Sequence, residues 1–391
     1  MIVGRAIELN VYIEDQSMSR RHAVLRFTRS SVLLEDLGSH NGTFLNGTRI
    51  DGEQSARYGD IIRCGNSLLM PVADIGPFKQ WPRSADQPVV AGPTLQKVLD
   101  AAQFVAPQDI DVLISGESGT GKELLAGYLH EQSGRAGPLV AVNCAAIPEA
   151  LFESELFGAK RGAYTGASEQ RAGLIAAAHK GTLFLDEVGE MPLALQAKLL
   201  RAVELREVRQ VGSDRSIKVN TRFVAATNRD LAAEAKAGNF REDLLHRLCG
   251  VTLQLPPLRQ RREDIVIFAR RFLAEAATDV APKDTATEYI EALLLQSWPG
   301  NVRQLRKAVR ESFVRAHLEG APQLESHHLA MSGASPVDPG SDPESQRIRQ
   351  ALQESGGNVA QAATLLGIGR SKLYRQLKAL GISPNDFRRD G

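Results

Sequence analysis

A glycine-rich loop at residues 116–123 constrains this chain more than any other feature of its sequence. It follows the apolar run 111–115, whose composition predicts a buried strand. Its glycines allow backbone N–H groups to close around phosphates, and the helix that follows directs its positive dipole end at them. The loop residues are Gly116, Glu117, Ser118, Gly119, Thr120, Gly121, Lys122 and Glu123. Because Lys122 would reach the β- and γ-phosphates, the loop predicts an ATP site in an α/β domain.

A second apolar run, 182–185, ends at two adjacent carboxylates, Asp186 and Glu187. At the end of a strand, Asp186 would hold Mg²⁺ and Glu187 would orient or activate the attacking water. Glu123 stands where many phosphate loops have a Ser or Thr, so this loop offers no hydroxyl to the metal in the ordinary way. For the loop alone, a glycine-rich turn without a ligand is the alternative. The carboxylate pair disfavours that alternative, and the two motifs together predict ATP and Mg²⁺ as cofactors.

Composition excludes several classes of protein. The 391 residues include 47 basic and 46 acidic side chains, so any surface for nucleic acid must be local. The three cysteines lie far apart, which indicates neither a zinc site nor a disulfide framework. His327 and His328 are adjacent but lack a thiol or carboxylate at ligand spacing, so we expect no metal role for them. No apolar run is long enough to span a membrane and no apolar leader opens the chain, so we expect a soluble cytoplasmic protein without a membrane partner.

Composition shifts along the chain predict four folded segments and two linkers. The first segment has short β-rich runs separated by Asn-Gly and Asp-Gly turns, which favours a β-sandwich. The second alternates apolar strands with helices, and the third is helical. Pro, Gly and polar residues mark both linkers. The division is a β-sandwich at 1–70, a linker at 71–93, an α/β segment at 94–258, a helical segment at 259–330, a linker at 331–343 and a helical end at 344–391.

The C-terminal segment has the pattern of two short helices. Apolar residues recur at helical spacing over 359–366 and again over 373–380, with Asn358 placed as an N-cap and Gly367 at the break. The whole segment carries eight basic side chains against four acidic ones. This pattern predicts a DNA-binding helix-turn-helix rather than a plain helical bundle with a solvated basic face. The candidates for groove and phosphate contacts are Arg370, Ser371, Lys372, Tyr374, Arg375 and Lys378.

Between the two halves of the nucleotide site lies the segment Gly162-Ala163-Tyr164-Thr165-Gly166-Ala167. It resembles the GAFTGA loop of the bacterial enhancer-binding proteins, which are AAA+ ATPases. That resemblance implies that the loop contacts the sigma factor and promoter DNA, and that the chain remodels closed complexes of sigma-54 RNA polymerase. Tyr164 stands where the family usually has phenylalanine, so the ring is kept and a hydroxyl is added. From composition alone, an ordinary surface loop is the alternative.

The same resemblance implies roles for further residues of the nucleotide site. Arginines that act in trans make hydrolysis depend on assembly, so the family implies a ring, by analogy a hexamer. For any single arginine, a solvated or ion-paired structural role is the alternative. The matches are Asn143 to the asparagine that switches the catalytic glutamate, Thr227 and Asn228 to sensor I, Arg241 and Arg247 to the trans-acting arginines, and Arg303 to the sensor II arginine.

The first 70 residues resemble a forkhead-associated (FHA) domain, a fold that recognises phosphothreonine peptides. By position, Arg5, Ser19 and Arg20 would bind the phosphate, Asn41 would contact the peptide backbone, and His22 would brace the loops. The motifs that carry this resemblance are Gly4-Arg5, Ser19–His22, Leu37–Thr43, Asn46-Gly47 and Gly59-Asp60.

Two departures from the FHA pattern leave an alternative open. His40 replaces the Ser or Thr often found before the asparagine, and the family has further strands upstream of Gly4-Arg5. We therefore expect either a truncated start or an incomplete sandwich with an unpaired edge. The alternative function for this segment is a purely structural interaction module.

The sequence as a whole predicts a multidomain protein: an N-terminal FHA-like β-sandwich, a central α/β AAA+ ATPase with a helical lid, and an all-α helix-turn-helix that resembles the Fis-type DNA-binding domain. We expect a sigma-54-dependent transcriptional activator that binds enhancer-like DNA and assembles with itself into a ring. Its input would come from a phosphothreonine-containing protein or a Ser/Thr kinase. The alternatives are an AAA+ ATPase that remodels a different DNA-bound complex, and a binding scaffold with an inactive nucleotide site.

Overall fold

The computed structural model describes residues 1–28, 31–79, 92–161, 171–277 and 283–329, together with 348, 351–353, 355, 358–366, 370, 373 and 377 of the C-terminal segment. Asp74–Ser332 form one compact unit, which contains the nucleotide motifs. Among the described residues, none of the helices is both long enough and apolar enough to pass through a bilayer.

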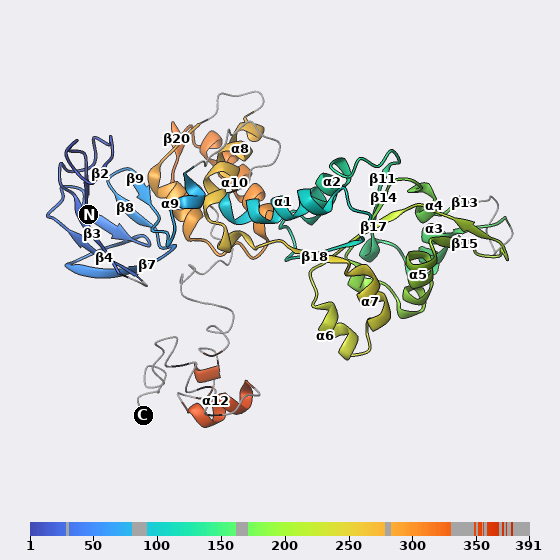
Figure 1. Cartoon of the computed structure of the whole chain (residues 1–391). Coiled ribbons are helices and arrows are strands. Elements are labelled where there is room, and N and C mark those ends of the chain that lie inside the picture. Colours follow the sequence, from blue (N-terminus) through green and yellow to red (C-terminus); the bar gives the residue numbers. More distant parts are fainter. Residues whose placement is uncertain are drawn as a thin grey trace. The chain divides into compact units, whose positions relative to one another are not determined.

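The N-terminal residues fold into a β-sandwich (Figure 1). One sheet has the order β2-β1-β3-β4-β7 and the other β6-β5-β8-β9. Strand β1 is interior, parallel to β2 and antiparallel to β3. Val3 and Leu34 from one sheet meet Ile62 and Cys64 from the other in a single core. The predicted β-sandwich is therefore confirmed. Its strands are β1 Ile2–Gly4, β2 Val11–Tyr12, β3 Ala23–Phe27, β4 Ser31–Asp36, β5 Thr43–Leu45, β6 Thr48–Arg49, β7 Glu53–Arg57, β8 Ile62–Cys64 and β9 Ser67–Leu69.

The centre of Asp74–Ser332 is a five-stranded, wholly parallel sheet of order β11-β14-β17-β10-β18. The strands predicted at 111–115 and 182–185 are present as β10 and β14. Because neighbouring strands run parallel, each connection between strands must cross over the sheet through a helix. The strands are β10 Val112–Ser115, β11 Leu139–Asn143, β14 Thr182–Asp186, β17 Arg222–Thr227 and β18 Val251–Gln254.

Helices cover both faces of this sheet. Leu183 and Leu185 of β14 pack into one core, and Phe184 between them packs into the core on the opposite face. Burial on both sides explains why the strand reads as a continuous apolar run. Helices α1 Pro93–Val105 and α2 Lys122–Glu131 cover the face of Phe184. The other face is covered by α3 Glu149–Phe157, α4 Leu174–Ala177, α5 Leu193–Leu205, α6 Leu231–Lys236 and α7 Glu242–Leu248.

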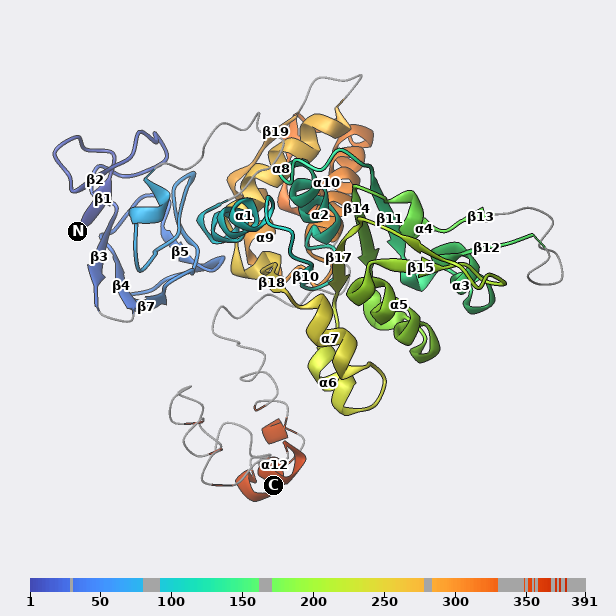
Figure 2. The same ribbon diagram turned by 45° about the vertical axis from the view of Figure 1, so that its right-hand side comes forward.

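The helical lid follows β18. Its helices are η4 Leu258–Gln260, α8 Glu263–Ala276, α9 Thr287–Leu295, α10 Asn301–Leu318 and η5 Ser326–His328, with a short parallel pair formed by β19 Asp284–Thr285 and β20 Gln323–Leu324. In Figures 1 and 2 the lid lies at the end of the unit that carries α1 and α2. The predicted helical segment is confirmed, and it places α10 beside the phosphate loop.

Two short hairpins lie at the opposite end of the unit from the lid (Figure 2). β12 Gly158–Ala159 pairs with β13 Arg171–Ala172, and β15 Glu207–Arg209 pairs with β16 Ser216–Lys218. The hairpins are joined, because the Lys160 N–H donates to Val211 O at 3.0 Å and the Val211 N–H donates to Gly158 O at 2.9 Å. The segment 162–167 is therefore connected to the unit by a paired base.

In the C-terminal segment, α12 Val359–Leu365 begins as predicted. The Asn358 carboxamide oxygen accepts the N–H groups of Ala360 and Gln361 at 3.0 and 3.3 Å, which is the geometry of an N-cap. The apolar side chains of this helix join those of neighbouring helical positions in one small core. Its buried members are Ile348, Ala351, Leu352, Ala362, Ala363, Leu373 and Leu377.

Candidate nucleotide site and lid contacts

The phosphate loop connects β10 to α2 and is held from two sides. The Gly116 N–H donates to the carbonyl of Thr227, at the end of β17, at 3.2 Å. On the other side, a Cβ at Gly119 would lie 2.4 Å from the carbonyl oxygen of Gly300 in the lid. Gly119 and Gly121 also have φ of +77° and +106°, which L side chains rarely adopt. Glycine is therefore required at 119 for close approach and at both positions for conformation.

The lysine of the loop and the carboxylates of β14 meet at one point. Lys122 is only 7% exposed, and its Nζ donates to Gly116 O at 3.0 Å and lies 3.4 Å from Glu187 Oε1. The other oxygen of Glu187 accepts the Asn228 N–H at 3.3 Å. Burial and the neighbouring Glu187 carboxylate raise the pKa of Asp186. The structure thus brings together five residues that the sequence singled out.

Glu187 occupies a left-handed backbone conformation, with φ of +50° and ψ of +49°. A non-glycine residue in this region is uncommon and costs free energy, and such conformations concentrate at functional sites. The turn η3 Val188–Glu190 follows directly and turns the chain away from the strand. This backbone geometry points the Glu187 carboxylate toward Lys122 and Asn228.

Asn143 and Thr227 lie at the C-terminal ends of β11 and β17, the two strands that flank β14. Asn143 is opposite Asp186 in the β11–β14 pairing, and its side-chain oxygen accepts the Ala145 N–H at 2.9 Å. The buried Thr227 hydroxyl accepts the N–H of Arg229 at 3.0 Å. Both residues are therefore close to the carboxylate pair along the sheet edge, and in this structure each side chain caps a turn.

The lid contacts the phosphate loop through Arg303, which the sequence analysis singled out, and through Arg259 and Asn301, which it did not. Arg259 donates to both carboxylate oxygens of Glu117, at 2.8 and 2.6 Å, and Asn301 donates to Glu117 Oε2 at 3.1 Å. These hydrogen bonds, those from Arg259 first, lower the pKa of Glu117. Arg303, the predicted sensor II residue, donates to Ser118 Oγ at 3.2 Å. Glu117 thus binds the lid with its side chain, and only its backbone faces the loop interior.

Arg247 is exposed on α7, and Arg241 is exposed at the N-cap of the same helix. Arg241 donates to the two carboxylate oxygens of Asp243 at 3.0 and 2.6 Å, and its backbone N–H donates to Gln196 at 2.8 Å. Across the described ranges, no hydrogen bond or ion pair connects either arginine with the phosphate loop of its own chain. Their exposure leaves both guanidinium groups accessible to a second molecule.

The four predicted phosphopeptide residues lie on adjoining loops of the sandwich. The Arg5 N–H donates to the carbonyl of Ser19 at 3.2 Å. A Cβ added at Gly4 would lie only 2.3 Å from the carbonyl oxygen of Arg20. Asn41 Nδ2 donates to Ser17 O at 2.7 Å. The side chains of Arg5 and Arg20 are exposed. The structure therefore gathers these residues at one end of the sandwich.

His22 is fully buried beneath these loops. Its Nδ1 accepts the Ser19 N–H at 3.0 Å, so the ring proton belongs on Nε2, which lies 3.2 Å from Gly42 O. Burial lowers the pKa of His22. The ring therefore connects the two loops as a neutral donor and acceptor, which agrees with the predicted bracing role.

Several predicted contact residues lie outside the described part of the chain. Arg370 is described, and it is helical and exposed. The others are Gly162, Ala163, Tyr164, Thr165, Gly166 and Ala167 of the sigma-contacting loop, and Ser371, Lys372, Tyr374, Arg375 and Lys378 of the DNA-binding set.

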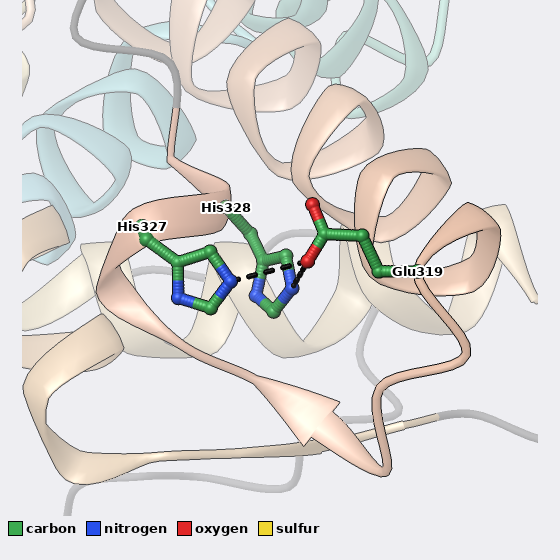
Figure 3. A group of neighbouring side chains, drawn as sticks. All are labelled: Glu319, His327 and His328. Atoms are coloured by element: carbon green, nitrogen blue, oxygen red, sulfur yellow. Dashed lines mark hydrogen bonds and ion pairs between the residues drawn. The ribbon is translucent and has the colours of Figure 1, made fainter.

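The adjacent histidines of the lid do have a carboxylate beside them, contrary to the sequence analysis (Figure 3). Glu319 Oε2 lies 3.2 Å from His327 Nε2 and 3.0 Å from His328 Nε2, and the three could hold a metal ion. However, His328 Nδ1 accepts the Glu325 N–H at 2.8 Å. The proton of a neutral His328 ring must then sit on Nε2, the atom a metal would need. This geometry favours a hydrogen-bonded contact between the end of α10 and η5.

Comparison with known proteins agrees with this geometry. Family models match four consecutive segments: an FHA domain at residues 1–65, a sigma-54 interaction domain at 89–254, an AAA+ ATPase lid domain at 259–338, and a bacterial regulatory protein of the Fis family at 341–380. Each segment contains the motif from which its fold was predicted.

Relatives cover most of the chain. The transcriptional regulatory protein GlrR of Escherichia coli is 42% identical over 77% of this chain and 69% of its own length, and FlbD of Caulobacter vibrioides is 41% identical over 74% and 69%. The solved structure of NtrX from Brucella abortus in complex with ATP is 33% identical over 75% of this chain and 70% of that chain, with a TM-score of 0.59. The chain therefore belongs to the sigma-54-dependent transcriptional activators, the bacterial enhancer-binding proteins, with an FHA domain before its AAA+ ATPase and a Fis-type helix-turn-helix after it.

Proposed function

We propose that this activator binds ATP with Mg²⁺ at the phosphate loop and couples its hydrolysis to remodelling of the closed sigma-54 polymerase complex. The observation that carries the proposal is the convergence of Lys122, Asp186 and Glu187 at the end of β14. The solved structures of NtrX in complex with ATP and with ADP support nucleotide binding at the same fold.

Each residue of the site has a proposed task. The backbone N–H groups of 116–121 would bind the phosphates, and Lys122 would leave Gly116 O to reach them. Glu187 would orient and deprotonate the attacking water, with Asn143 and Asn228 adjusting its position. Thr227 and Arg303 would contact the nucleotide from the sheet and from the lid. Glu123, in the first turn of α2, would complete the nucleotide-binding set.

The residues fit a magnesium site. Asp186 is a carboxylate whose pKa is raised by burial and by the adjacent Glu187, so a divalent cation there would offset the repulsion between the two groups. Carboxylate oxygen is the ligand that Mg²⁺ prefers. The cation would neutralise charge on the phosphates during transfer. Asp186 would hold it in place.

We propose that hydrolysis takes place between subunits of a ring, by family analogy a hexamer. The exposed Arg241 and Arg247 would reach the nucleotide of the neighbouring subunit. A guanidinium supplied in trans can contribute roughly 10³–10⁵ in rate. Tyr164 and its neighbours, 162–167, would contact the sigma factor, since the paired base at β12–β13 connects them to the ATPase unit.

The N-terminal domain would receive the regulatory signal, and the C-terminal domain would select the DNA site. A phosphothreonine partner or a Ser/Thr kinase would bind Arg5, Ser19, Arg20 and Asn41. Arg370 and the basic residues after it would contact enhancer-like DNA. We propose the domain division 1–70, 94–258, 259–330 and 344–391, with linkers between, and a cytoplasmic location because the DNA target is there.

Open-complex formation by purified sigma-54 polymerase tests the proposal. With this protein and hydrolysable ATP, the promoter is expected to open. Lys122→Ala should lose both opening and ATP turnover, whereas Tyr164→Ala should lose opening and keep turnover. Tyr164→Phe is the matched control, because it keeps the ring and should keep opening. The polymerase must be one that another activator can open, and the phosphorylated partner must be present. If ATP is then hydrolysed but the promoter stays closed, the protein acts on a different DNA-bound complex.

A further inference from the structure

The start of α1 is joined to the lid by unusually close contacts. The Gly92 N–H donates to Asp264 Oδ1, and the Thr94 N–H donates to Glu263 Oε1 at 3.3 Å. A Cβ at Gly92 would lie 2.4 Å from Glu263 Cγ and 2.6 Å from Asp264 Oδ1. Gly92 is the N-cap residue of α1. Its backbone therefore packs directly against the first turn of α8.

Asp264 leads on to the phosphate loop through a second buried charge. Asp264 and Arg261 are 0% and 1% exposed, and Asp264 Oδ2 lies 3.7 Å from Arg261 Nη1. The guanidinium then donates through Nη2 to the carbonyl of Thr120 at 2.8 Å. Thr120 is two residues before Lys122 in the loop. Three contacts thus join Gly92 to the loop that would bind the phosphates.

The buried pair of Arg261 and Asp264 is poorly explained as a contribution to the stability of the fold. Arg261 Nε and Asp264 Oδ2 are buried and have no hydrogen-bond partner among the described residues. Burial raises the pKa of Asp264 to about 7. A buried ion pair with unsatisfied atoms adds little to stability, and apolar replacements are often as stable. A polar pair in this place has a clearer purpose if it fixes the relative positions of Gly92 and Thr120.

We infer that Arg261 and Asp264 are positioning residues that set the phosphate loop at Thr120 according to the position of Gly92, so that a displacement at the start of α1 acts on nucleotide binding through them. The inference rests on the proposed binding of ATP at this loop. The inference follows from packing. Because Arg261 and Asp264 are enclosed by neighbouring side chains, a displacement of Gly92 cannot be absorbed by empty space before it reaches Thr120.

Steady-state ATP hydrolysis by the full-length protein tests the inference. Gly92→Ala inserts a Cβ that forces both Glu263 and Asp264 to move, and is expected to raise KM for ATP several-fold with a smaller change in kcat. Gly127→Ala is the matched control, because a Cβ at this helical position meets no atom within 4 Å. Its KM should equal that of the wild type. Equal KM values for Gly92→Ala and Gly127→Ala would overturn the inference.

A double-variant comparison separates positioning from general damage. Arg261→Lys keeps the charge but loses the planar group that reaches both Asp264 and Thr120. Once that connection is broken, Gly92→Ala should add no further rise in KM. If the two fold-changes multiply instead, the residues act independently and the inference is wrong.

Folding and nucleotide binding are checked in the same proteins. Asp264→Asn is the second variant if Arg261→Lys does not fold, since it keeps an acceptor for the Gly92 N–H and removes the charge facing Arg261. Its KM is expected to rise, and Gly92→Ala should again add nothing. A wild-type protein that does not bind ATP would contradict both the proposed function and this inference. Binding by the wild type with independent effects of the variants would contradict the inference alone.

Discussion

The Lys122 ammonium lies 3.4 Å from the Glu187 carboxylate, although the two residues come from different motifs 65 positions apart. In this contact the lysine that would bind phosphate is paired with the glutamate that would activate water. A phosphate entering the loop would compete for Lys122, because it carries more negative charge than a carboxylate. Nucleotide binding would then release Glu187 for its task. This exchange connects occupancy of the loop to the readiness of the catalytic group.

Glu187→Gln should separate binding from hydrolysis. The amide keeps the size of the side chain but cannot accept a proton, so ATP turnover should fall by about 10²–10⁴-fold. ATP affinity should stay the same or increase, since a negative charge near the phosphates is removed. Phosphate release and equilibrium binding of a fluorescent ATP analogue measure the two quantities. A parallel loss of affinity would show that Glu187 holds the loop together instead.

Arg259→Ala should weaken ATP binding without touching the catalytic carboxylates. Its removal leaves the Glu117 charge, at the mouth of the phosphate loop, without its principal partner. Because both side chains are partly exposed, water will screen the repulsion, and KM for ATP should rise only a few-fold.

The charge argument for Arg259 predicts a specific rescue. Adding Glu117→Gln to Arg259→Ala should return KM toward the wild-type value, since the repelling charge is gone. Arg306→Ala is the matched control, because it breaks an arginine–glutamate pair elsewhere on the lid. If KM is not restored in the double variant, while Arg306→Ala leaves KM unchanged, Arg259 acts by shape or packing rather than by neutralising Glu117.

The sheet and the catalytic carboxylates could be predicted because their signals are local. Leu183, Phe184 and Leu185 are consecutive apolar residues since both faces of the sheet are covered. Asp186 and Glu187 follow directly, so their position at the strand end was implied by the run itself. The same applies to Asn358, whose place before an apolar helical pattern predicted the cap that the structure shows.

The lid contacts could not be predicted because their partners are distant in the chain. Glu117 and Arg259 are 142 residues apart, and Glu117 and Asn301 are 184 apart, so no spacing rule relates them. A polar residue such as Asp264 also reads as solvated in a sequence, whereas the fold buries it completely. The carboxylate beside His327 and His328 was missed for a related reason, since Glu319 reaches them only after the chain turns back from α10 to η5.

His22 should make the phosphopeptide end of the FHA domain sensitive to acid. Its pKa is lowered by burial, and its Nδ1 must be unprotonated to accept the Ser19 N–H. The neutral ring's contribution to the stability of the folded domain is complete above pH 6.5, the ordinary pKa of histidine. That contribution is lost as the pH falls through the lower pKa of His22 in the folded state. Hydrogen-exchange protection of the Ser19 amide, corrected for intrinsic rates, should therefore decrease on acidification.

Two matched variants test that assignment to His22. In His22→Asn the side-chain oxygen can still accept a hydrogen bond but does not titrate, so the protection should no longer depend on pH. His40→Asn changes an exposed histidine of the same region and should leave the pH dependence in place. A wild-type protein with constant protection across this range would show that the ring remains neutral or does not hold the loop.

Arg247 should act on the nucleotide of a neighbouring subunit. It is exposed at the C-terminal end of α7, and Arg241, the N-cap of the same helix, is already paired with Asp243. Arg247→Ala and Glu187→Gln should each be almost inactive alone. When they are mixed in equal amounts, about one quarter of the interfaces in a random ring combine an intact site with an intact arginine, so hydrolysis should partly return. Mixing Glu187→Gln with Lys122→Ala is the control, because both damage the same site and no interface is restored. If the Arg247→Ala mixture stays as inactive as this control under conditions where subunits exchange, Arg247 serves its own subunit and the trans arginine must be sought elsewhere.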